Sequence, residues 1–149
     1  LRLHPLHANT AYVVINTNPP RSRQNKAAPR QGFITKWNTG SWSLEKYKKV
    51  GEKGITCIDL SADGRFLAFG SSELSVGMLD ATTLAVSNRC VSYFAANMFH
   101  LALAAILKAH EFPPTILKFN PTNTLLISGS PDNSLRVITV PDKSDGSGE

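Results

Sequence analysis

The chain has 149 residues, of which 42% are hydrophobic and 18% are charged, as in an ordinary globular domain rather than a disordered chain. Its two cysteines, Cys57 and Cys90, have neither the spacing of a metal site nor a disulfide framework, and its four histidines lack a Cys or carboxylate neighbour at ligand spacing. The spacing of these residues therefore argues against a zinc site.

Positive charge is concentrated in two segments and gives the chain a net charge of +5. The first segment contains Arg21, Arg23, Lys26 and Arg30. The second segment contains Lys46, Lys48, Lys49 and Lys53. Either segment could attract nucleic acid, anionic lipid or an acidic protein surface. The first segment lacks interleaved aromatic residues that would stack on bases, so we favour solvated loops and strand faces and expect no nucleic-acid partner.

The first strand that the pattern predicts is FITKW at residues 33–37, followed by the turn NTGS. After the turn comes WSLEKYKKV, whose apolar side chains alternate with charged ones, as expected of a half-exposed strand.

The chain then contains two copies of one pattern, because residues 52–80 align without a gap with residues 111–139 at an offset of 59. Each copy has three apolar runs separated by polar turns, the second of which contains an acidic residue. The runs are ITCIDL, FLAFG and SVGML in the first copy, and TILKF, LLISG and SLRVI in the second. Their length and composition predict a three-stranded meander in each copy.

This layout resembles the WD-repeat β-propeller, with Trp37-Asn38 where that family usually has Trp-Asp. In the two copies Leu79 and Ile138 hold the Trp position. The resemblance implies an all-β fold over residues 1–149, a partial propeller of about two to three four-stranded blades from a seven-bladed family fold, with a polar tail at 142–149.

Residues 86–103 do not fit the repeat, which in WD proteins has a period of about 40–45 residues. Without these 18 residues the period falls from 59 to 41. The segment is too short and too polar for a membrane helix, which needs about 20 apolar residues, and too apolar for an ordinary exposed loop. Val-Ser can be encoded by GTAAGT and Ala-Asn by GCTAAC, sequences found at intron starts and branch sites. We hypothesise a retained intron or a gene-model error, which sequencing of the spliced transcript would test.

The segments ITKWNTGSWSLEKYKKV, KAHEFPPT and FNPTNTLLISGS resemble the later blades of the endoplasmic-reticulum exchange factors for the Sar-type small GTPase, the Sec-twelve family. Without residues 86–103, the resemblance covers residues 11–141. It implies a propeller on the cytosolic face of the endoplasmic reticulum that binds the GDP-bound GTPase, promotes nucleotide release and starts COPII coat assembly. Such a protein acts by linked binding equilibria and is not an enzyme in the bond-making sense. The alternative is a WD scaffold in another complex, without exchange activity.

Three departures limit what the resemblance implies. The family's glycine-rich, potassium-binding loop has no counterpart in this sequence, so we expect no cofactor in it, and the family's membrane-spanning helix has no counterpart either. Two to three blades cannot close a ring, so strand edges would remain exposed. We therefore expect a soluble fragment that exchanges nucleotide poorly by itself and reaches a membrane only through an anchor that the sequence lacks.

Asp132 is the residue most easily mistaken for a catalytic group, because it stands in a turn with Ser and Gly neighbours. WD repeats place an Asp there to accept hydrogen bonds from the turn, and Glu73 holds the matching position in the first copy. His110 occupies the place of the family's Gly-His, so we expect it to form buried hydrogen bonds. No partner is placed for nucleophilic catalysis. The other expected structural positions are Gly129, Ser130, Gly70 and Trp37.

The basic segment from Arg21 to Arg30 is expected to join two strands of one blade. Of the predicted loops, it is the one to test for contact with an acidic partner surface.

Overall fold

The computed structural model describes residues 1–17, 31–86, 91–93 and 106–140. The basic segment at 21–30, the tail at 142–149 and most of 86–103 therefore lie outside the described residues. Within the described part the chain forms twelve strands, arranged as three antiparallel sheets of four strands each, and no helix. The all-β prediction is confirmed.

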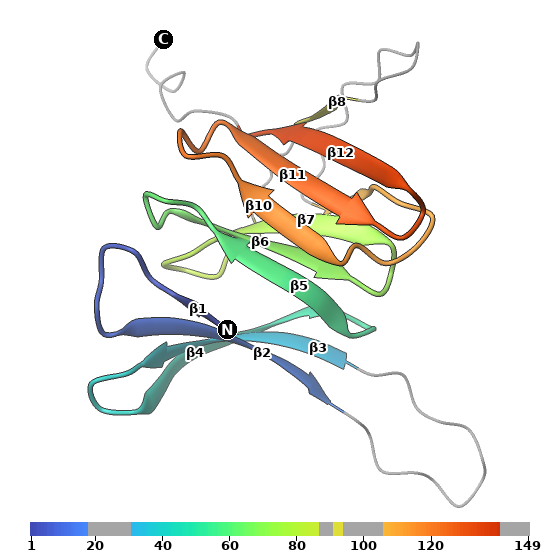
Figure 1. Ribbon diagram of the computed structural model, residues 1–149. Helices are drawn as coiled ribbons and strands as arrows, with labels where there is room; N and C mark the ends of the chain where they lie inside the picture. The colour runs from blue at the N-terminus through green and yellow to red at the C-terminus, as the bar shows by residue number, and fades with distance from the viewer. Residues whose placement is uncertain (18–30, 87–90, 94–105, 141–149) are drawn as a thin grey trace, which may run out of the picture.

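The three sheets are stacked, with the second between the first and the third (Figure 1). We call them blades 1, 2 and 3. Blade 1 contains β1 (Arg2–Leu3), β2 (Thr10–Thr17), β3 (Gln31–Asn38) and β4 (Ser43–Gly51). Blade 2 contains β5 (Ile55–Leu60), β6 (Phe66–Ser71), β7 (Ser75–Asp80) and β9 (Ile106–Lys108). Blade 3 contains β10 (Ile116–Phe119), β11 (Leu125–Ser130), β12 (Ser134–Thr139) and β8 (Val91–Tyr93).

The predicted meanders are present, since β5-β6-β7 and β10-β11-β12 each pair in sequence order. Even the turn conformations repeat. Gly64 and Asn123, which are 59 residues apart, have positive φ angles of 70° and 59°. Glycine and asparagine are the residues that enter this left-handed region most readily, so both turns are built with suitable residues. In the next turn Leu74 (φ 67°) and Asn133 (φ 60°) form a second equivalent pair.

Apolar side chains of each blade pack against the next blade. Blade 1 contributes Tyr12, Val14 and Ile34, which meet Ile58, Leu67 and Leu79 of blade 2. Blade 2 contributes Phe66, Ala68, Val76 and Met78, which meet Leu117, Leu126 and Ile138 of blade 3. At each junction, we call the contacting surface of the earlier blade its forward face and the contacting surface of the later blade its rear face. Burial of such a side chain stabilises the fold by roughly 1.5–3 kcal/mol, so the two junctions form the core.

The outer strand of blade 3 comes from the segment that disturbs the repeat, and the outer strand of blade 2 follows that segment. β9 pairs with β7 as Gly77 opposite Ile106 and Ser75 opposite Lys108, while Val86 forms a separate bridge with Leu79. β8 pairs with β12, with Val91 opposite Thr139. Residues 91–93 of the predicted insertion therefore lie along the edge of blade 3, and the retained-intron hypothesis stays a prediction.

Candidate functional site

A buried hydrogen-bond network surrounds His110, in the segment before β10. The Nε2 atom of His110 lies 2.6 Å from the hydroxyl of Ser128 on β11. Its Nδ1 atom lies 3.1 Å from a carboxylate oxygen of Asp132 and 3.0 Å from the hydroxyl of Ser134. The side chain of His110 is 0% exposed and that of Asp132 is 7% exposed. The structure thus brings His110 and Asp132 together, with two serines that the sequence analysis did not single out.

Asp132 also accepts hydrogen bonds from backbone N–H groups on both sides of the network. Glu111 donates from 2.9 Å, and Ser134 donates both its N–H at 2.9 Å and its hydroxyl at 2.6 Å. The hydroxyl of Ser134, followed by these N–H groups and His110, holds the pKa of Asp132 well below its usual range. The charged carboxylate therefore joins the segment before β10 to the start of β12.

Ser130 and Gly129 lie beside this network. The Ser130 hydroxyl donates to the Phe112 carbonyl at 2.9 Å, and the Asp132 N–H donates to the same hydroxyl at 3.4 Å. A Cβ on Gly129 would lie 2.7 Å from a methyl group of Ile116, its cross-strand partner. Such a contact is too close, so the blade packs tightly only with glycine here.

Blade 2 contains a reduced version of the same network. Glu73 accepts from the Glu52 N–H at 3.2 Å and donates its own N–H to the Ser71 hydroxyl at 3.0 Å. These bonds match those of Asp132 to Glu111 and Ser130, since the residues differ by the repeat offset. Gly51 and Phe69 replace His110 and Ser128, so the blade substitutes apolar packing for the buried imidazole.

The remaining predicted positions have local roles in the blades. The indole N–H of Trp37 donates to the Thr35 hydroxyl at 2.9 Å, and that hydroxyl donates to the Val13 carbonyl at 2.9 Å. Asn38, in place of the family's Asp, accepts from the N–H groups of Gly40 at 2.9 Å and Ser41 at 3.1 Å, which caps the turn.

Gly70 allows blades 2 and 3 to approach one another. A Cβ at this position would lie 2.7 Å from both the Cys57 sulfur and a ring carbon of Pro114. A larger residue would therefore push against the segment that leads into blade 3.

Two contacts between blades were missed by the sequence analysis. Asp59 on β5 is 6% exposed and contacts both neighbouring blades. It pairs with Arg2 of blade 1 at 2.9 Å, pairs with Lys118 of blade 3 at 3.2 Å, and accepts from the Phe119 N–H at 3.0 Å. The sequence signal for this contact is the single acidic residue in the apolar run ITCIDL. A charge buried in such a strand requires partners, so it predicts ion pairs or hydrogen bonds with neighbouring segments.

Tyr12 forms the second contact. Its hydroxyl donates to the Ala81 carbonyl at 2.8 Å, from blade 1 to the end of β7 in blade 2. Burial, and then the nearby carboxylates of Asp80 and Glu45, raise the pKa of Tyr12 to about 12.

The second basic segment is partly neutralised. Lys49 pairs with Glu52 at 2.8 Å, and the ammonium of Lys46 donates to the Thr82 carbonyl at 3.1 Å. On the neighbouring strand Lys36 pairs with Glu45 at 3.1 Å. The first segment, with Arg21, Arg23, Lys26 and Arg30, lies outside the described residues, so its predicted role in partner contact stays a prediction.

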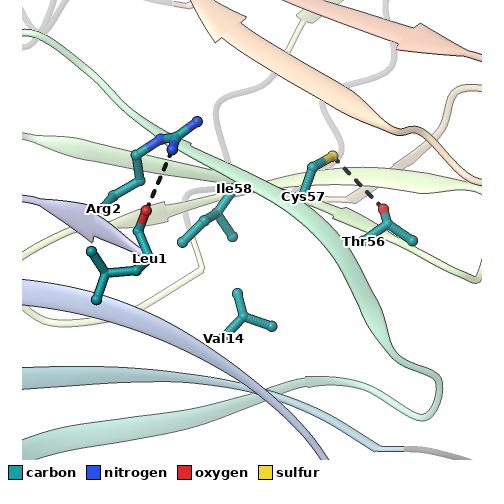
Figure 2. Close-up of a pocket in the computed structure, with 6 residues that line it drawn as sticks. All are labelled: Leu1, Arg2, Val14, Thr56, Cys57 and Ile58. Atoms are coloured by element: carbon teal, nitrogen blue, oxygen red, sulfur yellow. Dashed lines mark hydrogen bonds between the residues drawn. The ribbon is translucent and has the colours of Figure 1, made fainter.

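A small pocket of about 230 Å³ lies between the inner strands of blades 1 and 2 (Figure 2). It is lined by Leu1, Arg2, Val14, Thr56, Cys57 and Ile58. Burial raises the pKa of the Cys57 thiol, which disfavours the reactive thiolate. Over the described residues, no three His, Cys, Asp or Glu side chains are close enough to hold a metal ion.

Two segments of the chain, residues 45–77 and 102–139, match the family described as WD domain, G-beta repeat. Each matched segment contains the outer strand of one blade and the inner strands of the next, which is how a WD sequence repeat is divided between blades. With three antiparallel blades in the structure, these matches identify WD repeats that form part of a β-propeller.

It is also similar to SEC12-like protein 2 of Arabidopsis thaliana, with 28% identity over 119 residues. The match covers 80% of this chain and 26% of the relative, so the chain spans about a quarter of that protein's length. The predicted resemblance to WD repeats and to Sec-twelve proteins is confirmed. None of the described residues belongs to a helix long and apolar enough to cross a membrane.

Proposed function

We propose that the chain is part of a guanine nucleotide exchange factor that activates a Sar-type small GTPase at the cytosolic face of the endoplasmic reticulum, where it initiates COPII vesicle formation. The supporting observation is its similarity to a SEC12-like protein over 80% of its length. The stacked blades agree with this proposal, since propellers present loops and strand edges for protein contact (Figure 1).

An exchange factor acts by binding the nucleotide-free GTPase more tightly than the GDP-bound form, which is a shift of linked equilibria. Such selection requires a surface that does not adapt equally to both forms. The buried contacts of Asp59 and Tyr12 across the two junctions hold the blades in fixed relative positions. These contacts support a binding surface of fixed shape, as this mechanism requires.

Binding to a purified Sar-type GTPase tests the proposal. We expect tighter binding after EDTA has removed magnesium and nucleotide than in the presence of GDP and magnesium, as measured by calorimetry. Release of a fluorescent GDP analogue should be accelerated only slightly, because the sequence lacks the family's glycine-rich loop. Equal affinity for both forms, or no binding, would overturn the proposal.

The basic segment at 21–30 is the proposed contact with an acidic surface of the partner. Replacement of Arg21, Arg23, Lys26 and Arg30 by Glu should abolish binding, and affinity for the unaltered chain should fall as salt is added. A matched control reverses charge in the second segment, with Lys48→Glu and Lys53→Glu. If only the control weakened binding, the contact would lie in the second basic segment instead.

A WD scaffold without exchange activity is the second candidate. It is supported by the matched WD repeats, because propellers present loops and strand edges for protein contact. A partner that binds with no dependence on guanine nucleotide would support this alternative.

A further inference from the structure

The loop between β1 and β2 is held together by the side chain of His4. The Nδ1 atom of His4 accepts hydrogen bonds from the N–H groups of Leu6 and His7, both at 3.1 Å. A ring nitrogen that accepts carries no proton, so the neutral imidazole has its proton on Nε2. The ring of His7 lies beside that of His4, with centroids 4.4 Å apart. This loop therefore depends on the uncharged form of His4.

The same imidazole joins blade 1 to blade 2. It covers the turn between β5 and β6, because a Cβ on Gly64 would overlap the ring of His4. His4 also forms a hydrogen bond with the Gly64 backbone. The loop and the turn together line a pocket of about 250 Å³. This contact lies between two blades that the structure describes, so it does not depend on what packs against either end of the stack.

The groups around His4 disfavour a second proton on its ring. Burial, followed by His7 and then Lys36 on β3, lowers the pKa of His4 below its ordinary value of 6.5, and the hydrogen bond with the Gly64 backbone opposes this shift. On β2 the ring of Tyr12 lies 6.3 Å from that of His4, and its pKa of about 12 leaves it uncharged near neutral pH.

The carboxylates of blade 2 that line the pocket are already engaged. Asp63 pairs with Arg65 at 2.7 Å, and Asp80 accepts from the N–H groups of Thr82 at 3.0 Å and Thr83 at 2.8 Å. A protonated His4 would therefore gain an ion pair only at the expense of existing contacts.

We propose that His4 is a pH-sensitive contact between blades 1 and 2, which holds the β1–β2 loop on the β5–β6 turn near neutral pH and releases it in mild acid. Protonation turns Nδ1 from an acceptor into a donor that faces the N–H groups of Leu6 and His7, so both hydrogen bonds are lost.

The direction of the pH effect follows from the lowered pKa. Because the folded pKa of His4 lies below its unfolded value of 6.5, the stability that the contact contributes is fully present above about pH 6.5. It is lost as the pH falls through the folded pKa, where the folded chain must take up a proton that it binds poorly.

A titration of the 149-residue chain by NMR, from about pH 8 to about pH 5, tests the proposal. We expect the ring signal of His4 to titrate with a midpoint below 6.5. The amide signals of Leu6, His7 and Gly64 should shift with the same midpoint, because their contacts depend on the neutral ring. A His4 midpoint at or above 6.5, or amide signals that do not follow it, would overturn the proposal.

His4→Asn separates the hydrogen bonds from the titration. An asparagine oxygen can accept from N–H groups two and three residues later and does not titrate, so the loop should keep its shape while its pH dependence disappears. His7→Asn is the matched control, because it removes the other histidine of the loop and retains the Nδ1 acceptor of His4.

Urea unfolding at about pH 7.5 and about pH 5 compares the three chains. The loss of stability on acidification should be smaller in His4→Asn than in the unaltered chain and in His7→Asn. His110 is present in all three, so its own titration does not affect the comparison. An equal loss in all three chains would contradict the proposal. If His4→Asn failed to fold, the NMR titration of the unaltered chain would still decide the question.

Discussion

Asp132 makes its contacts as a charged group, and this has a consequence at low pH. Its folded pKa lies below the ordinary value of 3.8, so the folded state stabilises the carboxylate relative to the unfolded chain. The resulting stability is fully present above about pH 4 and is lost as the pH falls below the ordinary pKa toward the folded one.

Asp132→Asn should therefore lower the thermal midpoint at neutral pH and flatten its decline below about pH 4. In this variant, the side-chain amide points an N–H group toward donors from which the carboxylate accepts hydrogen bonds. Thermal unfolding between pH 7 and pH 2.5, followed by circular dichroism, measures both effects. If the variant and the unaltered chain lost stability in parallel below pH 4, other carboxylates would account for the acid sensitivity.

Tyr12→Phe tests the hydrogen bond that joins blades 1 and 2. Without the hydroxyl, the buried carbonyl of Ala81 loses its donor, which should lower the free energy of unfolding by about 1–3 kcal/mol. Urea unfolding measures this difference. Tyr47→Phe is the control, because Tyr47 is 69% exposed, and we expect no change.

The dependence of stability on pH above pH 10 provides a second test of Tyr12. Its folded pKa of about 12 exceeds the ordinary value of 10.0, so the stability that it contributes is present below pH 10 and is lost as the pH rises toward 12. Tyr12→Phe should therefore lose less stability over this range than the unaltered chain does.

At the scale of elements, the strands with a repeat were predictable from sequence. ITCIDL corresponds to β5 at Ile55–Leu60 without a shift, and FITKW lies within β3 at Gln31–Asn38. Both runs combine β-branched or aromatic residues with flanking turn residues, so local preference and fold agree. β1 and β8 have two and three residues. Strands this short show no hydrophobic periodicity, and their pairing depends on the tertiary structure.

The candidate network was predictable in part for the same reason. Asp132 and His110 stand at positions that a repeat identifies, whereas Ser128 and Ser134 become partners only when β11 and β12 pair. The contacts of Asp59 with Arg2 and Lys118 join residues that are 57 and 59 positions apart in the chain. No sequence pattern gives their distances, because they depend on how blades stack.

The register of β7 bears on residues 86–103. Asp80 donates its N–H to the Ala85 carbonyl at 2.9 Å, and Leu79 bridges Val86. Further along, Gly77 lies opposite Ile106. If the 18 residues were removed, residue 104 would follow Ala85 and take the place of Val86 opposite Leu79, and Ile106 would remain opposite Gly77. The remaining residues would form one continuous hairpin strand in the observed register.

Deletion of residues 86–103 should therefore leave the junction between blades 1 and 2 unchanged. We expect a folded variant whose amide protection from hydrogen exchange in β5, β6 and β7 equals or exceeds that of the full chain. Protection in β12 should fall, because β8 no longer covers its edge. Deletion of residues 86–102 removes one residue fewer and would place Ile106 opposite Val76 instead of Gly77, so that control should be less stable. Loss of protection in β7 after the first deletion would contradict the register argument.

At the scale of the whole molecule, stacked blades behave as a nearly one-dimensional array in which each unit contacts only its neighbours. Unfolding is then cooperative only if the junctions are strong. Asp59 is the described residue whose side chain contacts both other blades, through Arg2 and Phe119. Asp59 therefore couples the unfolding of the three blades in addition to stabilising blade 2.

Asp59→Ala should reduce both the stability and the cooperativity of unfolding. Loss of the acceptor for the Phe119 N–H should cost about 1–3 kcal/mol. Because the blades would then unfold more independently, the dependence of free energy on urea should become less steep. Asp63→Ala is the matched control, since among the described residues Asp63 forms its hydrogen bonds with Ser61 and Arg65 of its own turn. The control should shift the urea midpoint and leave the slope of free energy against urea unchanged. If Asp59→Ala also left this slope unchanged, apolar packing alone would couple the blades.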